Sequence, residues 1–134
     1  MAKIIMALDQ GTTSSRTILY NEKGMAIAMA NEAFPCQYPQ AGWVEQEAED
    51  IWQSQKNTMD AALEKAGLTL AEVAAIGITN QRETVIAWHA ETGKPVGKAI
   101  VWQCRRTAEY CDKLKAEGFD EVIKEKTGLV TDAY

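Results

Sequence analysis

Cysteine and histidine are scarce in this chain, and their scarcity removes whole classes of site. The 134 residues include one histidine, His89, and three cysteines, Cys36, Cys104 and Cys111, an odd number with no CxxC spacing. A disulfide framework needs paired cysteines, and a structural zinc site needs four cysteine or histidine ligands at short spacings. The sequence predicts neither.

Long apolar runs and an excess of positive charge are also missing. The first predicted strand contains only a few apolar residues, too few for the core of a signal peptide, and no apolar run is long enough to span a bilayer. The net charge is −5, whereas nucleic-acid surfaces need clustered lysine and arginine. We therefore expect a cytoplasmic protein with no membrane span and no nucleic-acid partner.

The amino-terminal hairpin, residues 3–20, has the chemistry of a phosphate site. Its turn consists of Gly11, Thr12, Thr13 and Ser14. Such a turn exposes backbone N–H groups, glycine lets the backbone approach a ligand closely, and the hydroxyl groups add donors. Asp9 can face a hydrated magnesium ion, and Arg16 offers a positive fork to phosphoryl oxygens. The alternative is an ordinary polar β-turn.

Two further strand ends carry polar residues. Residues 74–79 are predicted to form a buried strand and are followed by the polar run 80–84, and residues 100–107 place polar and aromatic residues just past a short apolar strand. Ligands of open α/β sheets bind beyond the carboxyl ends of strands. The residues at these three strand ends are therefore candidates to line one cleft.

The remaining pattern predicts alternating strands and helices. Strands are expected at about 4–8, 17–20, 25–30, 73–79, 84–88 and 99–102, and helices at about 47–66, 105–117 and 119–126. Apolar residues at three-to-four spacing in the first helix place Trp52 in the core. Arg105 and Arg106 are expected to open a solvated helix, His89 to lie in an exposed turn, and Cys104 to be either reactive or simply buried.

Four segments resemble one family closely. The residues at 7–16 (ALDQGTTSSR), 77–84 (GITNQRET), 100–107 (IVWQCRRT) and 127–130 (TGLV) are similar to the amino-terminal part of the glycerol kinases, in the FGGY family of carbohydrate kinases. The resemblance covers essentially the whole chain. It implies an α/β, actin-like ATPase (RNase-H-like) fold with a mixed sheet flanked by helices. Members are much longer, so residues 1–134 are expected to be part of an amino-terminal kinase domain, with the second domain absent.

The resemblance also implies a reaction and its residues. The family transfers the γ-phosphate of ATP to glycerol with Mg²⁺, which gives sn-glycerol 3-phosphate and ADP. In the family, residues matching Thr12, Thr13, Ser14 and Arg16 contact the nucleotide phosphates, and residues matching Arg82, Glu83, Trp102 and Tyr134 line the glycerol pocket. The polyol segments are thus 80–88 and 100–107, with Asp9 holding Mg²⁺ through water. The catalytic base is expected beyond residue 134, so residues 1–134 should be inactive alone, and the full-length protein should be a homo-oligomer.

Without the resemblance, Arg82 and Glu83 would be interpreted as an exposed ion pair. An exposed ion pair is common and energetically minor, and neighbours on a strand point to opposite faces. Both can touch one ligand only if the chain leaves regular strand geometry there. Two other readings stay open, another sugar or polyol kinase of the same family and a non-catalytic actin-like module that binds phosphate.

Overall fold

The computed structural model describes residues 3–134, which form two compact units. Unit 1 consists of residues 3–36 and 46–82, and unit 2 consists of residues 37–45 and 83–134. Among the described residues, no helix has the length and apolar character needed to cross a membrane.

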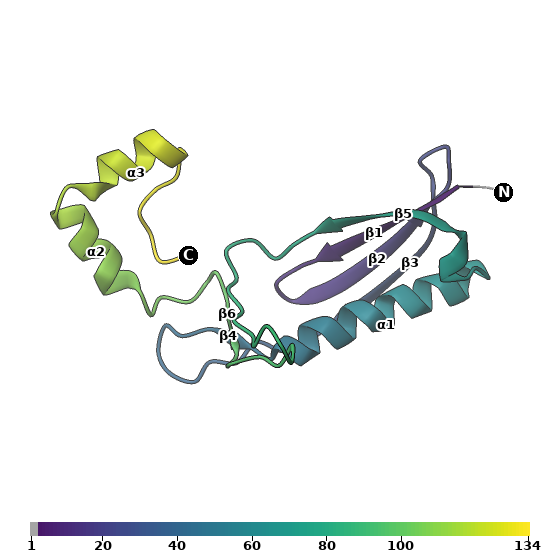
Figure 1. Ribbon diagram of the computed structural model, residues 1–134, viewed down its shortest axis with the longest axis horizontal. Coiled ribbons are helices and arrows are strands. Elements are labelled where there is room, and N and C mark those ends of the chain that lie inside the picture. Colours follow the sequence, from purple (N-terminus) through teal and green to yellow (C-terminus); the bar gives the residue numbers. More distant parts are fainter. Residues whose placement is uncertain (1–2) are drawn as a thin grey trace. The chain divides into compact units, whose positions relative to one another are not determined.

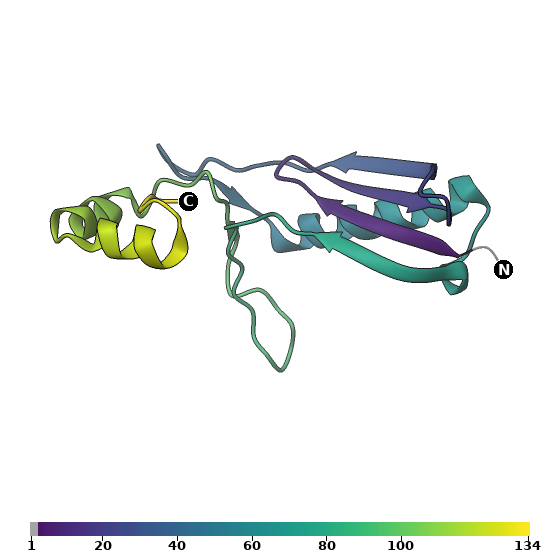
Figure 2. The same cartoon turned by 90° about the horizontal axis from the view of Figure 1, so that it is seen from above.

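Unit 1 is built on a four-stranded mixed sheet. Its strands are β1 (Ile4–Gln10), β2 (Ser14–Tyr20), β3 (Ala26–Ala33) and β5 (Val73–Thr79), in the order β3-β2-β1-β5. β1 and β5 are parallel and the other pairs are antiparallel, as Figures 1 and 2 show. This sheet confirms the predicted hairpin and the mixed sheet that the resemblance implies. The strands of the hairpin extend closer to the turn than the apolar pattern indicated.

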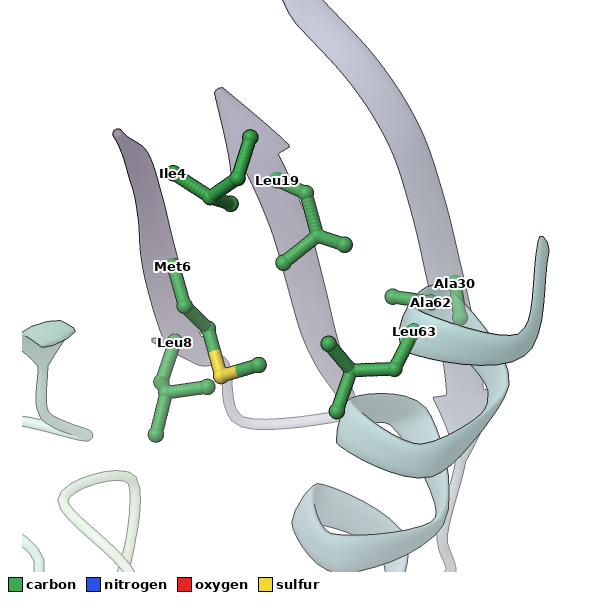
Figure 3. Packing of buried hydrophobic residues seen from close by; sticks show 7 residues of the cluster. All are labelled: Ile4, Met6, Leu8, Leu19, Ala30, Ala62 and Leu63. Carbon is green, nitrogen blue, oxygen red and sulfur yellow. The ribbon is translucent and has the colours of Figure 1, made fainter. Parts of the chain in front are cut away.

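One helix, α1 (Ala48–Ala66), covers one face of this sheet (Figure 1). Side chains alternate along each strand, so every second residue of β1 and β2 points toward the helix. Figure 3 shows the resulting core, which consists of Ile4, Met6, Leu8, Leu19, Ala30, Ala62 and Leu63. A short 3₁₀ turn, η1 (Leu70–Glu72), leads from the helix into β5.

The amino-terminal half of α1 meets β2 through hydroxyl groups instead of apolar side chains. Ser15 and Ser54 hydrogen-bond through their Oγ atoms at 2.8 Å, and Thr17 and Thr58 through their Oγ1 atoms at 2.9 Å. Trp52 is 62% exposed, so its predicted place in the core was wrong. The apolar spacing misled because the buried face of the helix is largely polar here.

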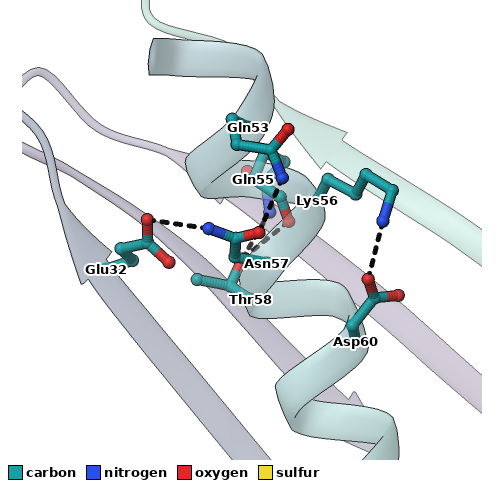
Figure 4. A network of polar contacts seen from close by, with 7 residues as sticks. All are labelled: Glu32, Gln53, Gln55, Lys56, Asn57, Thr58 and Asp60. Atoms are coloured by element: carbon teal, nitrogen blue, oxygen red, sulfur yellow. Dashed lines mark hydrogen bonds and ion pairs between the residues drawn. The ribbon is translucent and has the colours of Figure 1, made fainter.

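Helix α1 makes further polar contacts, within itself and with β3, which Figure 4 shows. Asn57 Nδ2 donates to Glu32 Oε1 on β3 at 3.0 Å, and Lys56 pairs with Asp60 at 2.8 Å, one helical turn away. At the end of the helix, Gly67 takes a left-handed conformation (φ 65°), and its N–H caps the last carbonyls. The helix therefore ends where the sequence predicts.

β5 is an exposed edge strand, and the prediction that it is buried was wrong. Ile76 is 46% exposed and Ile78 is 73% exposed. Both share a face with Met6 and Leu8 of β1, but α1 packs mainly on β2 and β3. The strand consists largely of apolar residues, yet no element of unit 1 covers Ile76 and Ile78.

Unit 2 has little regular structure before its two helices. Its Glu45 belongs to β4 (Glu45–Gln46), which pairs with β6 (Ala99–Ile100), and its helices are α2 (Ala108–Ala116) and α3 (Phe119–Thr127). The predicted strand 84–88 is not continuous, because only isolated bridges form, Val85 with Ile100 and Trp88 with Pro95. Helix α2 begins three residues later than predicted. His89 lies exposed in the turn, as predicted.

Candidate functional site

The carboxyl ends of β1 and β5 meet at one edge of the sheet in unit 1. Asp9 stands in register with Arg16 on β2 and with Thr79 on β5. Arg16 Nη1 lies 3.9 Å from Asp9 Oδ2, and both side chains are about half exposed (46% and 48%). A carboxylate and a guanidinium therefore stand side by side next to the turn, both accessible to a ligand.

The turn between β1 and β2 has a fixed backbone. The N–H of Gly11 donates to the carbonyl oxygen of Ser14 at 3.0 Å, and a Cβ placed on Gly11 would lie 2.9 Å from that same oxygen. Glycine is required at this position because real Cβ atoms do not approach so closely. Thr13 is exposed, whereas Thr12 and Ser14 are half-buried. The turn thus presents hydroxyl and N–H donors at one end of the strands.

Asp9 suits a magnesium ion that keeps most of its water. Within residues 3–134, no three side chains of the Asp, Glu, His or Cys type come together in a way that could hold a metal ion. Mg²⁺ is usually bound through one or two carboxylates together with water and substrate phosphates. A single half-exposed carboxylate beside a phosphate-type turn fits that mode of binding, and it does not fit a cage made of protein ligands alone.

The segment after β5 leaves strand geometry at Glu83. In the part of the chain that the structure describes, Glu83 is the one residue other than glycine with a positive φ, 58°. Neighbouring residues of a strand point to opposite faces, so Arg82 and Glu83 can contact one ligand only if the backbone leaves strand geometry here. Both side chains are exposed. The two residues belong to different units, Arg82 to unit 1 and Glu83 to unit 2.

Unit 2 contains a pocket of about 220 Å³. Three of the residues predicted to bind polyol line it, Glu83, Trp102 and Tyr134. Trp102 and Tyr134 are partly exposed (39% and 47%), so an aromatic wall and a carboxylate face the same space. Pockets for drug-sized ligands measure about 300–1,000 Å³, so this one suits a smaller molecule.

Arg106 is a pocket residue that the sequence analysis misassigned. Its guanidinium lies 3.8 Å above the ring of Trp43, Nη2 donates to Glu45 Oε1 at 2.7 Å, and Nε donates to Cys104 Sγ at 3.0 Å. The Arg106 and Glu45 side chains are only 17% and 15% exposed. The prediction of a solvated arginine was therefore wrong. Its partner Glu45 is 61 residues away, and helical periodicity gives no signal of such a contact.

Hydrogen bonds within the pocket wall lower the pKa values of Cys104 and Asp132, which both line the pocket. Burial acts to raise the pKa of the Cys104 thiol, but the hydrogen bond from Arg106 and neighbouring backbone N–H groups outweigh burial and hold the pKa below its usual value. The N–H of Ala133, together with Arg105, lowers the pKa of the Asp132 carboxyl.

Residues 131–134 are anchored within unit 2 by polar contacts to Arg105, which precedes α2, and to Asp120 of α3. Arg105 Nη1 lies 2.7 Å from Asp132 Oδ1, and the N–H of Ala133 donates to the same oxygen at 2.8 Å. Asp132, Ala133 and Tyr134 all line the pocket. This short segment has no regular structure, so the Arg105–Asp132 pair, together with the hydrogen bond from Thr131 to Asp120, positions it beside the pocket. The sequence pattern gave no indication of these contacts.

Known proteins resemble the chain over nearly its whole length. A profile described as "FGGY family of carbohydrate kinases, N-terminal domain" matches residues 4–134. The glycerol kinase of Thermoanaerobacter pseudethanolicus is 58% identical over all 134 residues, which make up 27% of that relative. The chain thus spans about a quarter of the length of the curated relatives it matches.

Solved structures agree with the architecture. Plasmodium falciparum glycerol kinase, solved with ADP, superposes with a TM-score of 0.88 at 33% identity and covers 99% of this chain, which corresponds to 27% of that one. A gluconate kinase from Lactobacillus acidophilus also has a TM-score of 0.88, with 98% of this chain and 26% of that one covered, at 23% identity. The second likeness speaks for the fold alone. Together they confirm the predicted actin-like ATPase fold.

Proposed function

Because the chain belongs to the FGGY family of carbohydrate kinases, we propose that it is the amino-terminal part of an ATP-dependent glycerol kinase. The reaction transfers the γ-phosphate of ATP to a terminal hydroxyl of glycerol and gives sn-glycerol 3-phosphate and ADP. The observation that carries the choice of substrate is the small pocket in unit 2, which combines Glu83, Trp102 and Tyr134. The 58% identity to a glycerol kinase supports the same choice.

A polyol presents hydroxyl groups along one side and carbon along the other. Its recognition calls for charged hydrogen-bonding partners and an aromatic wall. In this proposal Glu83 and Arg82 accept from and donate to neighbouring hydroxyl groups, Trp102 covers the carbon edge, and Tyr134 adds a hydroxyl donor. The volume of about 220 Å³ suits a small polyol.

The turn of unit 1 holds the phosphate end of the reaction. Thr12, Thr13 and Ser14 donate to the phosphoryl oxygens of ATP, Gly11 permits their close approach, and Arg16 neutralises charge. Mg²⁺ bound through water to Asp9 would offset the negative charge that builds up on the transferring phosphoryl group. Asp9, at 3.9 Å from Arg16, also keeps that guanidinium beside the turn.

The described residues account for only part of a kinase. We propose that the base that receives the glycerol proton, and a second domain, are supplied by chain beyond residue 134, and that the complete enzyme is a homo-oligomer. A cytoplasmic location is proposed as well. It is supported by the cysteines Cys36, Cys104 and Cys111, which are free, as is usual in a reducing compartment.

The test is a coupled ADP-release assay on the protein at its natural length, with MgATP and a panel of glycerol, xylulose and gluconate. Glycerol should be the preferred substrate. Preference for a five- or six-carbon substrate would overturn the choice of glycerol and leave the kinase assignment intact. Residues 1–134 produced alone should release no ADP in a glycerol-dependent manner, because positioning supplies most of the catalysis in phosphoryl transfer. Robust glycerol-dependent turnover by residues 1–134 alone would contradict the proposal that the base and a second domain are supplied by chain beyond residue 134.

A further inference from the structure

Gln46 has a fully buried polar side chain and no role in the proposed reaction. Its exposure is 0%, and it belongs to unit 1 together with the turn and the end of β5. A buried amide must find partners for its two N–H donors and its oxygen, or it destabilises the fold. All three groups of Gln46 have partners.

The partners of Gln46 lie on segments that are far apart in sequence. Nε2 donates to the carbonyl oxygen of Thr12 at 2.5 Å and to Cys36 Sγ at 3.1 Å, and Oε1 accepts from Gln81 Nε2 at 3.1 Å. Thr12 is in the turn between β1 and β2, and Gln81 directly precedes Arg82. One side chain therefore connects the phosphate turn with the segment that leads to the polyol residues.

The bond to Thr12 has a directional consequence. A trans peptide is planar, so its C=O and N–H point in opposite directions. Since the Thr12 carbonyl points at buried Gln46, the N–H of Thr13 points the opposite way. The next peptide is held similarly, because the Thr13 carbonyl accepts from the N–H of Phe34 at 3.2 Å. Two successive peptide planes of the turn are thus anchored through their carbonyl groups.

We propose that Gln46 is a positioning residue for nucleotide binding, which aims the N–H of Thr13 at the phosphates of ATP and ties the turn to Gln81. The inference rests on the proposed function. It makes Gln46 different from Arg16, which acts on the nucleotide alone, and from Glu83, which acts on the polyol alone. Both ligands depend on Gln46.

The experiment measures binding of MgATP and of glycerol by calorimetry to the protein at its natural length. Gln46→Met preserves side-chain length and removes all three hydrogen bonds. It should weaken MgATP at least about tenfold, the equivalent of roughly 1.4 kcal/mol, and weaken glycerol by a smaller factor. Gln46→His can still donate to Thr12 with one ring nitrogen and accept from Gln81 with the other, so it should recover most of the affinity.

Thr58→Val is the matched control. It removes a buried hydroxyl of the same unit that bonds Thr17 of β2 and no residue of the turn. Its melting temperature should fall, while both dissociation constants should stay at the wild-type values. Equal losses of affinity in Thr58→Val and Gln46→Met would reduce Gln46 to a purely structural role and overturn the inference.

Three further outcomes are decisive. If Gln46→Met does not fold, Gln46→Asn, which keeps the amide but withdraws it by one methylene, should show the same loss of MgATP affinity, and unchanged affinity in it would refute the inference. A wild-type protein that binds no MgATP overturns the proposed function and this inference with it. A wild type that binds MgATP, beside a Gln46 variant that binds it equally well, overturns the inference alone.

Discussion

Replacing Glu83 by glycine should separate stability from activity. Glu83 has φ 58°, in the left-handed region that costs a side-chain-bearing residue about 1–2 kcal/mol. Glycine removes that strain but loses roughly 0.5–1 kcal/mol through the greater freedom of the unfolded chain. The two terms leave Glu83→Gly as stable as wild type or more stable by up to about 1.5 kcal/mol. Substitutions generally destabilise, so the expected sign is unusual.

Activity should move in the opposite direction. The Glu83 carboxylate faces the pocket with Trp102 and Tyr134, and a hydrogen bond to a charged group contributes about 1.5–3 kcal/mol. The kcat/KM for glycerol should therefore fall at least about tenfold, the size of a 1.4 kcal/mol loss. Thermal unfolding and coupled kinetics on Glu83→Gly, with Glu83→Ala as the variant that loses the carboxylate but keeps the strain, test both halves. The reasoning is refuted if Glu83→Gly melts well below Glu83→Ala, or if it keeps wild-type kcat/KM.

Three other perturbations address different parts of the chain. Arg16→Ala should raise the KM for ATP and leave glycerol affinity nearly intact without nucleotide, and because exposed ion pairs contribute only about 0–1 kcal/mol, its melting temperature should barely change; a loss of glycerol affinity would contradict the assignment. Arg106→Met leaves Glu45 unpaired, so unfolding free energy should fall by about 3 kcal/mol, with partial recovery in the double variant with Glu45→Gln. The same change removes the bond that lowers the pKa of Cys104, so the pH midpoint of its alkylation should rise, and an unmoved midpoint would refute that cause. Residues 1–134 alone should self-associate through the exposed edge strand β5, and Ile78→Lys should reduce this self-association in sedimentation experiments. A protein that is monomeric at all concentrations would contradict self-association through β5.

The sequence predicted the elements whose causes are local. The hairpin and the end of α1 at Gly67 follow from apolar alternation, turn residues and a left-handed glycine, and the structure confirms both. The phosphate turn is also local, since its donors are neighbours in sequence. The need for irregular backbone near Arg82 could be stated from strand geometry before Glu83 was seen to provide it.

Burial and long-range polar partners could not be predicted in the same way. Trp52 is exposed because hydroxyl groups form that part of the interface between α1 and β2, and a count of apolar residues cannot detect a polar interface. β5 is exposed because its burial depends on whether another element covers it, not on its own composition. The pairing of Arg106 with Glu45 brings together residues that share no periodic pattern.

The hydroxyl pairs between α1 and β2 also determine how motion is transmitted. Apolar surfaces tolerate sliding, because dispersion contacts are weak individually and have little directionality. Hydrogen bonds at 2.8 Å and 2.9 Å do not tolerate it, and a shift by one residue, about 1.5 Å along the helix and 100° around it, would break both. These two hydrogen bonds therefore fix the position of α1 along β2. Any displacement of α1 must carry β2, and with it the turn at the start of β2, as one rigid piece.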